Sequence, residues 1–386
     1  MQANRFLVNL SRAAIAAAAA VTLTGAVAMA HDGTGDPRDF LRERPDDALA
    51  VTTLVRTGSG EHTYENVPNW CQIPGGRPTL GPQHGGIVED KEGLIYFTMD
   101  PPSQQAILVY KPDGTFVKGI GDEKLTGIHG MNINEENGEQ FLYGAHLSGQ
   151  RAVKLKLDGT LVWEIPFEKF NESGKYKEKK QFHPTGIAVA PDGSVFVADG
   201  YGTNWVHKFD KDQKYVMSFG GPGKEEGQFS TCHGLGIDKR GEKPLLLVCD
   251  RANRRLQEFD LDGKFVKVIA TGLRLPCAPS FHGDHIAIAE LEGRVTILDG
   301  ENKEVAHLGD NPDVKQRANY NVPPEEMKPG IFTAPHGVSF DHEGNVYVMD
   351  WNKSGRVSKF KQVGAADAAK QAAKPAAETP AKVATR

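Results

Sequence analysis

The sequence predicts an all-β fold, a six-bladed β-propeller closed by an N-terminal strand. The first observation is a short phrase in which His-Gly is followed by an apolar residue. It occurs at Ile128–Met131, Cys232–Leu235 and Pro335–Val338. An apolar residue stands four positions after each of these histidines, and a run of β-forming residues follows. The phrase therefore starts a strand and not a helix.

The second observation is that the whole chain can be aligned on this phrase. The alignment gives six copies of about forty to sixty residues, each with two or three short strands separated by turns. The residues that share the histidine register are His84, His129, Thr185, His233, Cys277 and His336. Strands at about ten-residue spacing indicate an all-β domain. Six small sheets packed radially about a channel make a β-propeller.

The first thirty residues are typical of a secretory signal peptide. Arg5 and Arg12 precede an alanine-rich apolar stretch, and Ala28-Met29-Ala30 is a small-x-small cleavage site. We predict a cleaved signal peptide over residues 1–30, a polar arm over residues 31–48, and a secreted or periplasmic protein. An uncleaved anchor is the alternative. No other stretch is long and apolar enough to span a bilayer.

The propeller is predicted over residues 49–363. Its last copy stops near Phe360, one strand short, whereas Val51–Val67 is strand-like and precedes the first copy. We therefore expect the N-terminal segment to supply the missing outer strand, which removes an exposed sheet edge. Residues 364–386 are rich in Ala, Lys and Pro, and we predict a disordered tail there.

Composition narrows the classes of partner. The chain is 39% hydrophobic and 25% charged, with a formal net charge of -5. A mildly acidic chain lacks the basic surface that binds nucleic acid. We therefore expect neither a nucleic-acid nor a membrane partner. We also expect the protein to be a monomer. Two long connections, Pro166–His183 and Asp310–Ala334, are candidate walls of a binding cleft, because long loops in compact domains are usually functional or mobile.

Three of the registered residues predict a metal site. His129, His233 and His336 fall in alternate blades, about 120° apart around the propeller axis. Three neutral imidazoles with a water molecule form a catalytic type of zinc site, with one position open to substrate. A lone buried histidine is usually a core residue, but the shared register favours metal ligands. His84 has the same register and is a candidate fourth ligand or substrate contact.

Four cysteines in an exported protein suggest disulfides. Cys232 precedes a predicted ligand, and Cys277 occupies the histidine register one blade further on. We predict a disulfide between these two, with Cys71 and Cys249 free or paired. Ligation of the metal by the Cys277 thiolate is the alternative.

Acidic residues recur where the second strand of a copy ends, at Asp199, Asp250, Glu290 and Asp350. Aspartate side chains commonly accept hydrogen bonds from the turn that follows them. We interpret these four as structural caps.

The third and fourth copies resemble NHL-type repeats, and in particular the peptidyl-α-hydroxyglycine α-amidating lyase family. The resemblance is carried by Phe182–Val189, Val197–Tyr201, Gly227–Leu235, Cys249–Asn253 and Arg255–Gln257. It extends from about Leu80 to Phe360 and is densest between Phe182 and Phe259.

The resemblance implies a six-bladed propeller with zinc on its axis, held by His129, His233 and His336. The family's catalytic tyrosine, in an Asp-Gly-Tyr phrase, matches Tyr201, and its active-site arginine, in an Asp-Arg phrase, matches Arg251. A phenol acidified by a nearby cation can act as a general base. A guanidinium can bind a substrate carboxylate. The alternatives are a tyrosine that fills an interface and an arginine that makes a salt bridge between blades.

Three departures from the family are visible. The family's first-blade arginine has no counterpart within Tyr96–Ile107. The acidic residue that follows the last histidine and helps to bind calcium in the family is Gly337 here, so no calcium is assigned. The half-cystine beside the tyrosine is Gly202.

Two classes of function follow from these observations. The first, implied by the resemblance, is a zinc lyase that cleaves the C–N bond of a carbinolamide in a small or peptide substrate, giving an amide and an aldehyde such as glyoxylate. A monooxygenase acting upstream would supply that substrate. The second class is a non-catalytic NHL-repeat propeller that binds a peptide, glycan or protein. A calcium-dependent hydrolase is a weaker third class, since calcium prefers oxygen ligands.

Overall fold

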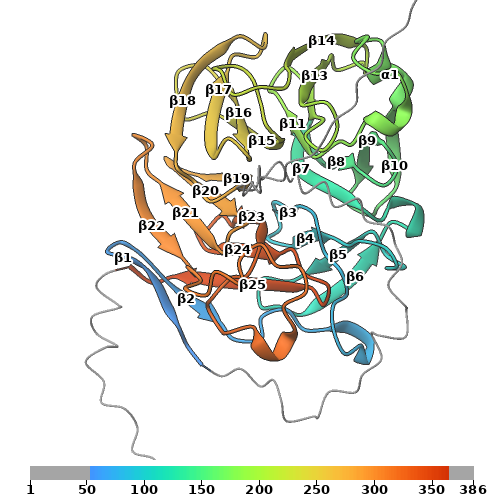
Figure 1. Ribbon diagram of the computed structural model, residues 1–386. Helices are drawn as coiled ribbons and strands as arrows, with labels where there is room; N and C mark the ends of the chain where they lie inside the picture. Colours follow the sequence, from blue (N-terminus) through green and yellow to red (C-terminus); the bar gives the residue numbers. More distant parts are fainter. Residues whose placement is uncertain (1–52, 365–386) are drawn as a thin grey trace, which may run out of the picture. The chain divides into compact units, whose positions relative to one another are not determined.

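The computed structural model describes residues 53–364. These residues form six antiparallel sheets arranged around a common centre (Figure 1). The predicted six-bladed β-propeller is confirmed. The predicted signal peptide (1–30) and polar arm (31–48) lie outside the described residues, as does the predicted tail from residue 365 onward.

In the first three sheets along the chain, the four strands follow one another in sequence. They are β3 (Ile87–Glu89), β4 (Ile95–Thr98), β5 (Ile107–Tyr110) and β6 (Phe116–Ile120); β7 (Ile128–Glu136), β8 (Glu139–His146), β9 (Arg151–Lys156) and β10 (Leu161–Pro166); and β11 (Gly186–Val189), β12 (Val195–Ala198), β13 (Trp205–Phe209) and β14 (Tyr215–Gly220).

The next two sheets repeat this arrangement. They contain β15 (Cys232–Asp238), β16 (Leu245–Asp250), β17 (Arg255–Phe259) and β18 (Phe265–Thr271), then β19 (Pro276–His282), β20 (His285–Glu290), β21 (Arg294–Leu298) and β22 (Glu304–Leu308).

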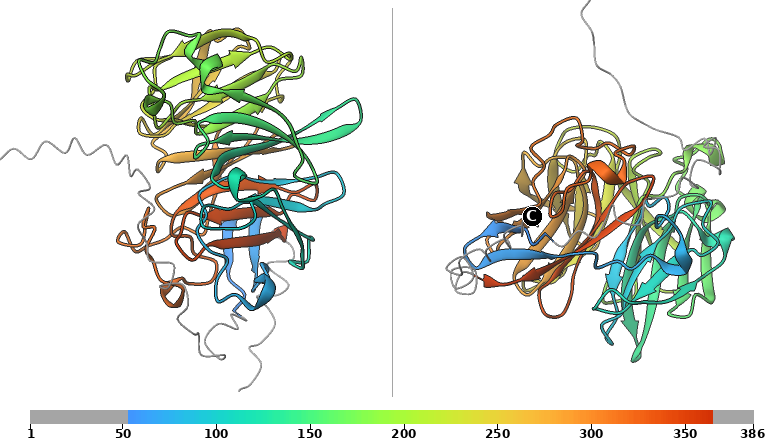
Figure 2. Two further views of the ribbon diagram at one scale, coloured as in Figure 1. Left: turned by 90° about the vertical axis from the view of Figure 1, so that its right-hand side faces the viewer. Right: turned by 90° about the horizontal axis from the view of Figure 1, so that it is seen from below.

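The sixth sheet joins the two ends of the described chain. Its strands are β23 (Pro335–Phe340), β24 (Val346–Asp350), β25 (Arg356–Gln362), β2 (His62–Val67) and β1 (Arg56–Ser59). Strand β2 is antiparallel to β25, with Tyr64 opposite Gln362 and Val67 opposite Lys359. The blue β1 and β2 accordingly lie beside the red C-terminal strands in Figure 2. The predicted closure by an N-terminal strand is confirmed.

Helices are few and short. They are α1 (Phe167–Asn171) and the 3-10 turns η2 (Pro74–Gly76), η3 (Glu123–Leu125), η4 (Lys179–Gln181) and η5 (Pro324–Glu326). Within residues 53–364, no helix is long and apolar enough to cross a membrane.

The hydrophobic core is divided among the contacts between neighbouring sheets. Six clusters of buried side chains each join two adjacent sheets. In the cluster between the last and first sheets, Tyr347 and Met349 pack with Ile87 and Phe97. Burying one such side chain stabilises the fold by about 1.5–3 kcal/mol. The ring is therefore closed by packing as well as by the β2–β25 pairing.

The innermost strands are irregular where the registered residues stand. Pairing shifts between Ile128 and Gly130 in β7, between Cys232 and Leu235 in β15, and between Pro335 and Gly337 in β23. A β-bulge leaves the extra residue unpaired and re-aims its side chain. The bulges therefore free the intervening histidines from the regular alternation of the strand.

The glycine after each histidine has a packing role. A Cβ atom on Gly130 would lie 2.4 Å from the Thr185 carbonyl oxygen, and one on Gly234 would lie 2.2 Å from that of Cys277. Because only glycine permits so close an approach, the His-Gly phrase brings adjacent innermost strands together.

The predicted disulfide between Cys232 and Cys277 is wrong. All four cysteines lie within the described residues, and all are free thiols. Cys232 is packed between the third and fourth sheets, with its Sγ 3.7 Å from the Trp205 carbonyl oxygen. Cys277 belongs to the core between the fifth and sixth sheets. The two thiols occupy different interfaces and do not face each other.

Candidate active site

The structure brings the three predicted metal ligands together. The ring centroids of His129, His233 and His336 form a triangle whose three sides are all 4.7 Å. Each residue is only 2% exposed. The ring of His84 lies 4.5 Å from those of His129 and His336. Three imidazoles from β7, β15 and β23, with that of His84 just before β3, therefore converge near the centre of the propeller.

Backbone carbonyl groups orient two of these imidazoles. Nδ1 of His129 lies 2.6 Å from the carbonyl oxygen of Thr185, and Nδ1 of His233 lies 2.8 Å from that of Cys277. In each pair, the acceptor is the residue at the same register in the next sheet. When Nδ1 donates its proton in this way, Nε2 is left as an acceptor, which is the usual arrangement behind a metal-binding histidine.

His336 also supports a metal site, because of the hydrogen bonds that it lacks. Both of its ring nitrogens are buried, and neither forms a hydrogen bond of standard geometry with residues 53–364; the Gly85 backbone only weakly opposes the lowering of its pKa by burial. Buried polar atoms are nearly always satisfied. An imidazole with two unsatisfied nitrogens beside two oriented imidazoles fits a position that a metal ion would complete.

The protonation state of the cluster also suits a metal. Burial lowers the pKa of His129 to about 3, and it lowers the pKa values of His233 and His336 well below their usual range. The positive charge of Arg251 acts in the same direction on all three. These imidazoles are therefore neutral at physiological pH, which is the form that coordinates metals.

Two overlapping groups of side chains could hold a metal ion. The ligand atoms of His84, His129 and His336 all lie within 4.8 Å of one another, and so do those of His233, Cys277 and His336. The three predicted histidines are divided between these groups, and His336 belongs to both. Cys277 and His84, which the sequence offered as additional ligands, lie in the same cluster. Imidazole and thiolate donors suit zinc, whereas calcium takes oxygen ligands.

Tyr201 lies at the centre of this cluster. Its hydroxyl oxygen is 3.2 Å from Nε2 of His84, 3.3 Å from Nε2 of His129 and 3.1 Å from Nε2 of His233. Nη1 of Arg251 donates a hydrogen bond of 2.9 Å to the same oxygen. The two predicted catalytic side chains therefore contact each other, and Tyr201 contacts two of the three predicted metal ligands, His129 and His233.

The surroundings of Tyr201 do not acidify its phenol. Burial raises the pKa of Tyr201, and the Arg251 guanidinium opposes this shift only in part. Loss of water around a phenolate thus outweighs the attraction of the Arg251 guanidinium alone. The lowering of this pKa by a metal ion bound beside Tyr201 stays a prediction.

A polar network fixes the turn that carries Tyr201. Asp199 accepts hydrogen bonds from the His183 amide at 2.6 Å, from the Thr203 amide at 2.7 Å and from the Tyr176 hydroxyl at 2.9 Å. The Tyr201 amide donates to the His183 carbonyl group. The connection 166–183, which the sequence analysis predicts as a candidate wall of a cleft, thus holds the turn that carries Tyr201 in place.

Three further residues near the cluster were not predicted as site residues. Trp351 lies 5.5 Å from His84, and Tyr320 lies 5.0 Å from Trp351, between ring centroids. Burial raises the pKa of both Tyr201 and Tyr320, and the negative charge of Asp100 adds a smaller effect in the same direction. Only one signal was available in the sequence: Asp100 ends the second strand of its copy, in the same place as the four acidic caps.

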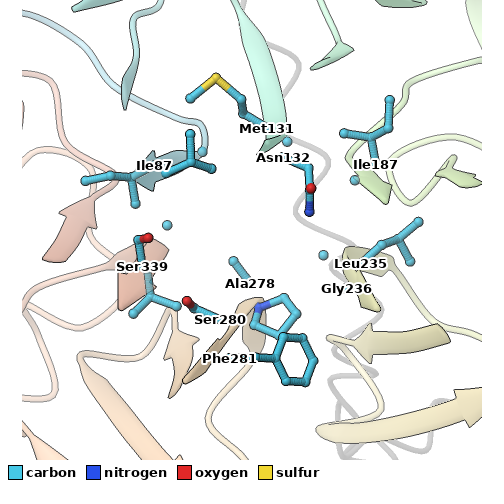
Figure 3. A pocket seen from close by; sticks show the side chains of 18 of the residues that line it. Ile87, Met131, Asn132, Ile187, Leu235, Gly236, Ala278, Ser280, Phe281 and Ser339 are labelled. Carbon is cyan, nitrogen blue, oxygen red and sulfur yellow. The ribbon is translucent and has the colours of Figure 1, made fainter. Parts of the chain in front are cut away.

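A central cavity of about 660 Å³ is bounded by the six innermost strands and includes His129, His233, Cys277 and His336 in its lining. Figure 3 shows apolar side chains around it, among them those of Ile87, Ile187 and Leu235. Tyr201, Arg251 and His84 are not part of this lining. The imidazoles therefore border two regions, the central cavity and the group formed with Tyr201.

Comparison with known proteins gives partial sequence matches. The NHL repeat family matches residues 183–209. The mouse (Mus musculus) "Peptidyl-glycine alpha-amidating monooxygenase" is 31% identical over 179 residues, which is 43% of this chain and 17% of the mouse protein. The human (Homo sapiens) "NHL repeat-containing protein 3" is 26% identical over 45% of this chain and 51% of its own length. A Caenorhabditis elegans protein named "Probable peptidyl-alpha-hydroxyglycine alpha-amidating lyase" is 29% identical over 32% of this chain and 35% of its own length.

Solved structures resemble the fold over most of the chain. A gluconolactonase of Xanthomonas campestris has a TM-score of 0.54 at 13% identity and covers 84% of this chain and 99% of its own. A streptogramin B lyase has a TM-score of 0.52 at 14% identity, with coverages of 80% and 98%. At such identities the likeness concerns the fold alone, and the chain spans at most about half the length of the sequence relatives named above. The chain is thus a six-bladed propeller with an NHL repeat, and it resembles the peptidyl-α-hydroxyglycine α-amidating lyases in sequence.

Proposed function

We propose that this protein is a zinc-dependent lyase that cleaves the C–N bond of a carbinolamide, of the type found in a peptidyl-α-hydroxyglycine. The observation that carries the proposal is the position of the Tyr201 hydroxyl, within 3.3 Å of Nε2 of three histidines and 2.9 Å from Nη1 of Arg251. A candidate base, a carboxylate-binding group and a metal-binding group thus meet at one point.

His129, His233 and His336 would hold the zinc ion, with Cys277 or His84 near enough to join them. The fit rests on their neutral imidazoles and on the unsatisfied nitrogens of His336. Zinc in such a site acts as a Lewis acid on a substrate oxygen and favours its deprotonation.

Tyr201 and Arg251 have separate tasks in the proposed reaction. Arg251 binds the carboxylate of the α-hydroxyglycine unit, which directs the hydroxyl group toward Tyr201. The Tyr201 oxygen takes the hydroxyl proton as a general base in its ionised form, which a zinc ion bound beside it would favour over the neutral phenol. The O–H electron pair forms the C=O bond of glyoxylate, the C–N bond breaks, and the nitrogen takes the proton from Tyr201 and leaves as the amide. Atoms and charge balance without a further reactant.

The position of the enzyme in a reaction sequence follows from this chemistry. A carbinolamide next to a carboxylate arises when the α-carbon of a C-terminal glycine is hydroxylated, so a monooxygenase acting upstream would supply the substrate. Residues 1–30 have the pattern of a signal peptide, and we propose that the reaction takes place outside the cytoplasm.

The test combines metal content with product release. Purified protein is expected to contain zinc and to release glyoxylate from an α-hydroxyglycine peptide, and chelation should abolish the release until zinc is restored. His233→Ala should lose most of the metal, whereas His282→Ala, at the far end of β19, should keep it. Full metal occupancy in His233→Ala would refute the site. Metal-independent binding of a peptide or glycan, without any turnover, would favour the binding-module alternative.

A further inference from the structure

The residues that end the second strand of each sheet can be compared with one another by the hydrogen bonds that their side chains make. In five of the six sheets, the side chain at this position is held by hydrogen bonds from its own blade; these residues are His146, Asp199, Asp250, Glu290 and Asp350. Asp100 is the sixth. Its carboxylate has no hydrogen bond or salt bridge to any residue between 53 and 364, although Asp100 is only 7% exposed. The fold has therefore not used this carboxylate as a cap.

The location of Asp100 relates it to the candidate active site. Its amide donates a 3.1 Å hydrogen bond to the carbonyl oxygen of Pro82, two residues before His84. The amide of Gln83, the residue after Pro82, donates to the Asn352 carbonyl oxygen at 3.4 Å, and the Lys353 amide donates to the Tyr320 carbonyl oxygen at 3.0 Å. These backbone contacts place Asp100 beside the segment that carries Trp351 and beside the connection 310–334. Burial raises the pKa of Tyr320, and the negative charge of Asp100 adds to this shift.

Two aromatic rings lie in this region. Trp351 and Tyr320 are 5.0 Å apart and tilted by 34°. Trp351 also contacts His84, whose ring is stacked on that of Tyr201 at 6.0 Å, and the guanidinium carbon of Arg251 lies 4.9 Å from the centre of the Tyr201 ring. The contacts therefore run in the order Arg251, Tyr201, His84, Trp351 and Tyr320. A cation stands at one end of this row, and aromatic rings with a nearby carboxylate stand at the other.

Asp100 is removed from most of the surrounding water and receives no hydrogen bond from residues 53–364, so a ligand that supplies a charged donor can bind its carboxylate. Donors that combine positive charge with affinity for aromatic faces are ammonium groups, which are attracted by tryptophan and tyrosine rings. A carboxylate or a phosphate would be repelled by Asp100. The chemistry of the three side chains therefore selects one class of ligand.

We propose that Asp100, Tyr320 and Trp351 form a subsite for an ammonium group of the substrate. The proposal rests on the lyase function given above and specifies its substrate: a short aminoacyl-α-hydroxyglycine with a free amino terminus. Arg251 binds the carboxylate at one end of this zwitterion, and Asp100 binds the ammonium at the other. The subsite thus selects short peptides with unblocked amino termini.

The test uses two product amides that differ only in this charge, phenylalaninamide and N-acetylphenylalaninamide, titrated calorimetrically into the zinc-loaded protein. Wild-type protein is expected to bind the free amine about ten-fold more tightly or better, the effect of one charge-assisted hydrogen bond. Asp100→Asn should reduce this preference to about one. Asp113→Asn, an exposed change in the same sheet, should leave it intact, and Tyr320→Leu should reduce it in part.

Equal binding of the two amides by the wild type, undetectable binding of the free amine, or a preference that survives in Asp100→Asn would each overturn the subsite. If Asp100→Asn does not fold, an undiminished preference in Tyr320→Leu overturns it instead. Glyoxylate release is measured separately. Turnover without an amine preference contradicts the subsite alone, whereas an amine preference without turnover contradicts the lyase function alone.

Discussion

Tyr201 illustrates how several residues share one hydroxyl group. Three imidazole nitrogens and one guanidinium nitrogen lie within 3.3 Å of its oxygen. These groups come from the first, second and fourth sheets, while Tyr201 follows β12 of the third. A glycine precedes the tyrosine because a Cβ atom on Gly200 would lie 2.0 Å from the Cys232 carbonyl oxygen. In the Asp-Gly-Tyr phrase, the aspartate therefore fixes the turn, the glycine allows close approach to the neighbouring backbone, and the tyrosine supplies the reactive side chain.

Replacing Tyr201 with Phe should separate catalysis from folding. The ring contacts with His84 and His129 remain possible, and no proposed metal ligand is removed. We expect unchanged zinc content and a rate of glyoxylate release lower by about 10² to 10⁴, the usual contribution of a positioned proton-transfer group. A Tyr201→Phe protein that retains wild-type kcat would contradict the role of general base.

Arg251 is expected to act on substrate binding. Arg251→Ala removes a bidentate donor for the substrate carboxylate, so KM for a peptidyl-α-hydroxyglycine should rise by about ten-fold or more. Arg251→Lys keeps the charge but not the planar fork, and we expect an intermediate KM. Steady-state kinetics with a substrate whose carboxylate is esterified supplies the control. Equal loss toward the acid and the ester would indicate that Arg251 acts by positioning Tyr201 and not by binding the carboxylate.

At the scale of single elements, the β-bulge and the glycine act together. Each bulge turns a histidine out of the strand ladder. The glycine beside it lets the next innermost strand approach, so that the strand can present a carbonyl group to Nδ1. The two-residue phrase therefore positions both a ligand and the group that orients it.

The pairing of β2 with β25 makes a second prediction at this scale. A chain that begins after Val67 lacks β1 and β2, so it leaves β25 as an unpaired edge and exposes the core around Tyr64. We expect an insoluble product or one without a cooperative unfolding transition. A chain that begins at Thr53 keeps both strands and is the control. Cooperative thermal unfolding of the shorter chain, measured by circular dichroism, would argue against closure by β2.

Over the whole molecule, stability depends on six similar interfaces, and several contain buried histidines. Between the second and third sheets, His207 contacts the Tyr176 hydroxyl through Nε2 at 2.6 Å and the Ser218 hydroxyl through Nδ1 at 2.7 Å. Burial lowers the pKa of His207 to about 3 and that of His146 to about 4. Both remain neutral in the folded protein at pH values where the unfolded chain is protonated.

The sign of the resulting pH dependence follows by linkage. Because the folded pKa of His207 is below the unfolded value of 6.5, its contribution is present above pH 6.5. It is lost as the pH falls toward 3. The free energy of unfolding of the wild type should decrease more steeply between pH 6.5 and 4 than that of His207→Gln, by up to about 1.4 kcal/mol per pH unit. Urea denaturation at several pH values measures this difference, and parallel curves for the two proteins would refute it.

The sequence by itself determined the six repeats, the closure of the ring and the register of its histidines. These features are periodic, and a period in the chain becomes a rotation about one axis once each repeat packs only against its neighbours. Tyr201 and Arg251 could be predicted from the sequence because their phrases stand at corresponding points of two adjacent repeats. For the same reason, His84 and Cys277 were available as additional members of the metal-binding cluster.

The tertiary structure alone decided which way individual side chains face. Cys232 and Cys277 stand at neighbouring positions of adjacent repeats, which predicts a disulfide, but packing places them in two separate interfaces. The raised pKa of Tyr201 depends on how much water its neighbours exclude. Asp100 has the same sequence position as the acidic caps, yet only closure of the ring brings its charge near Tyr201 and Tyr320. Orientation and desolvation depend on contacts between distant segments, and no local pattern in the chain encodes them.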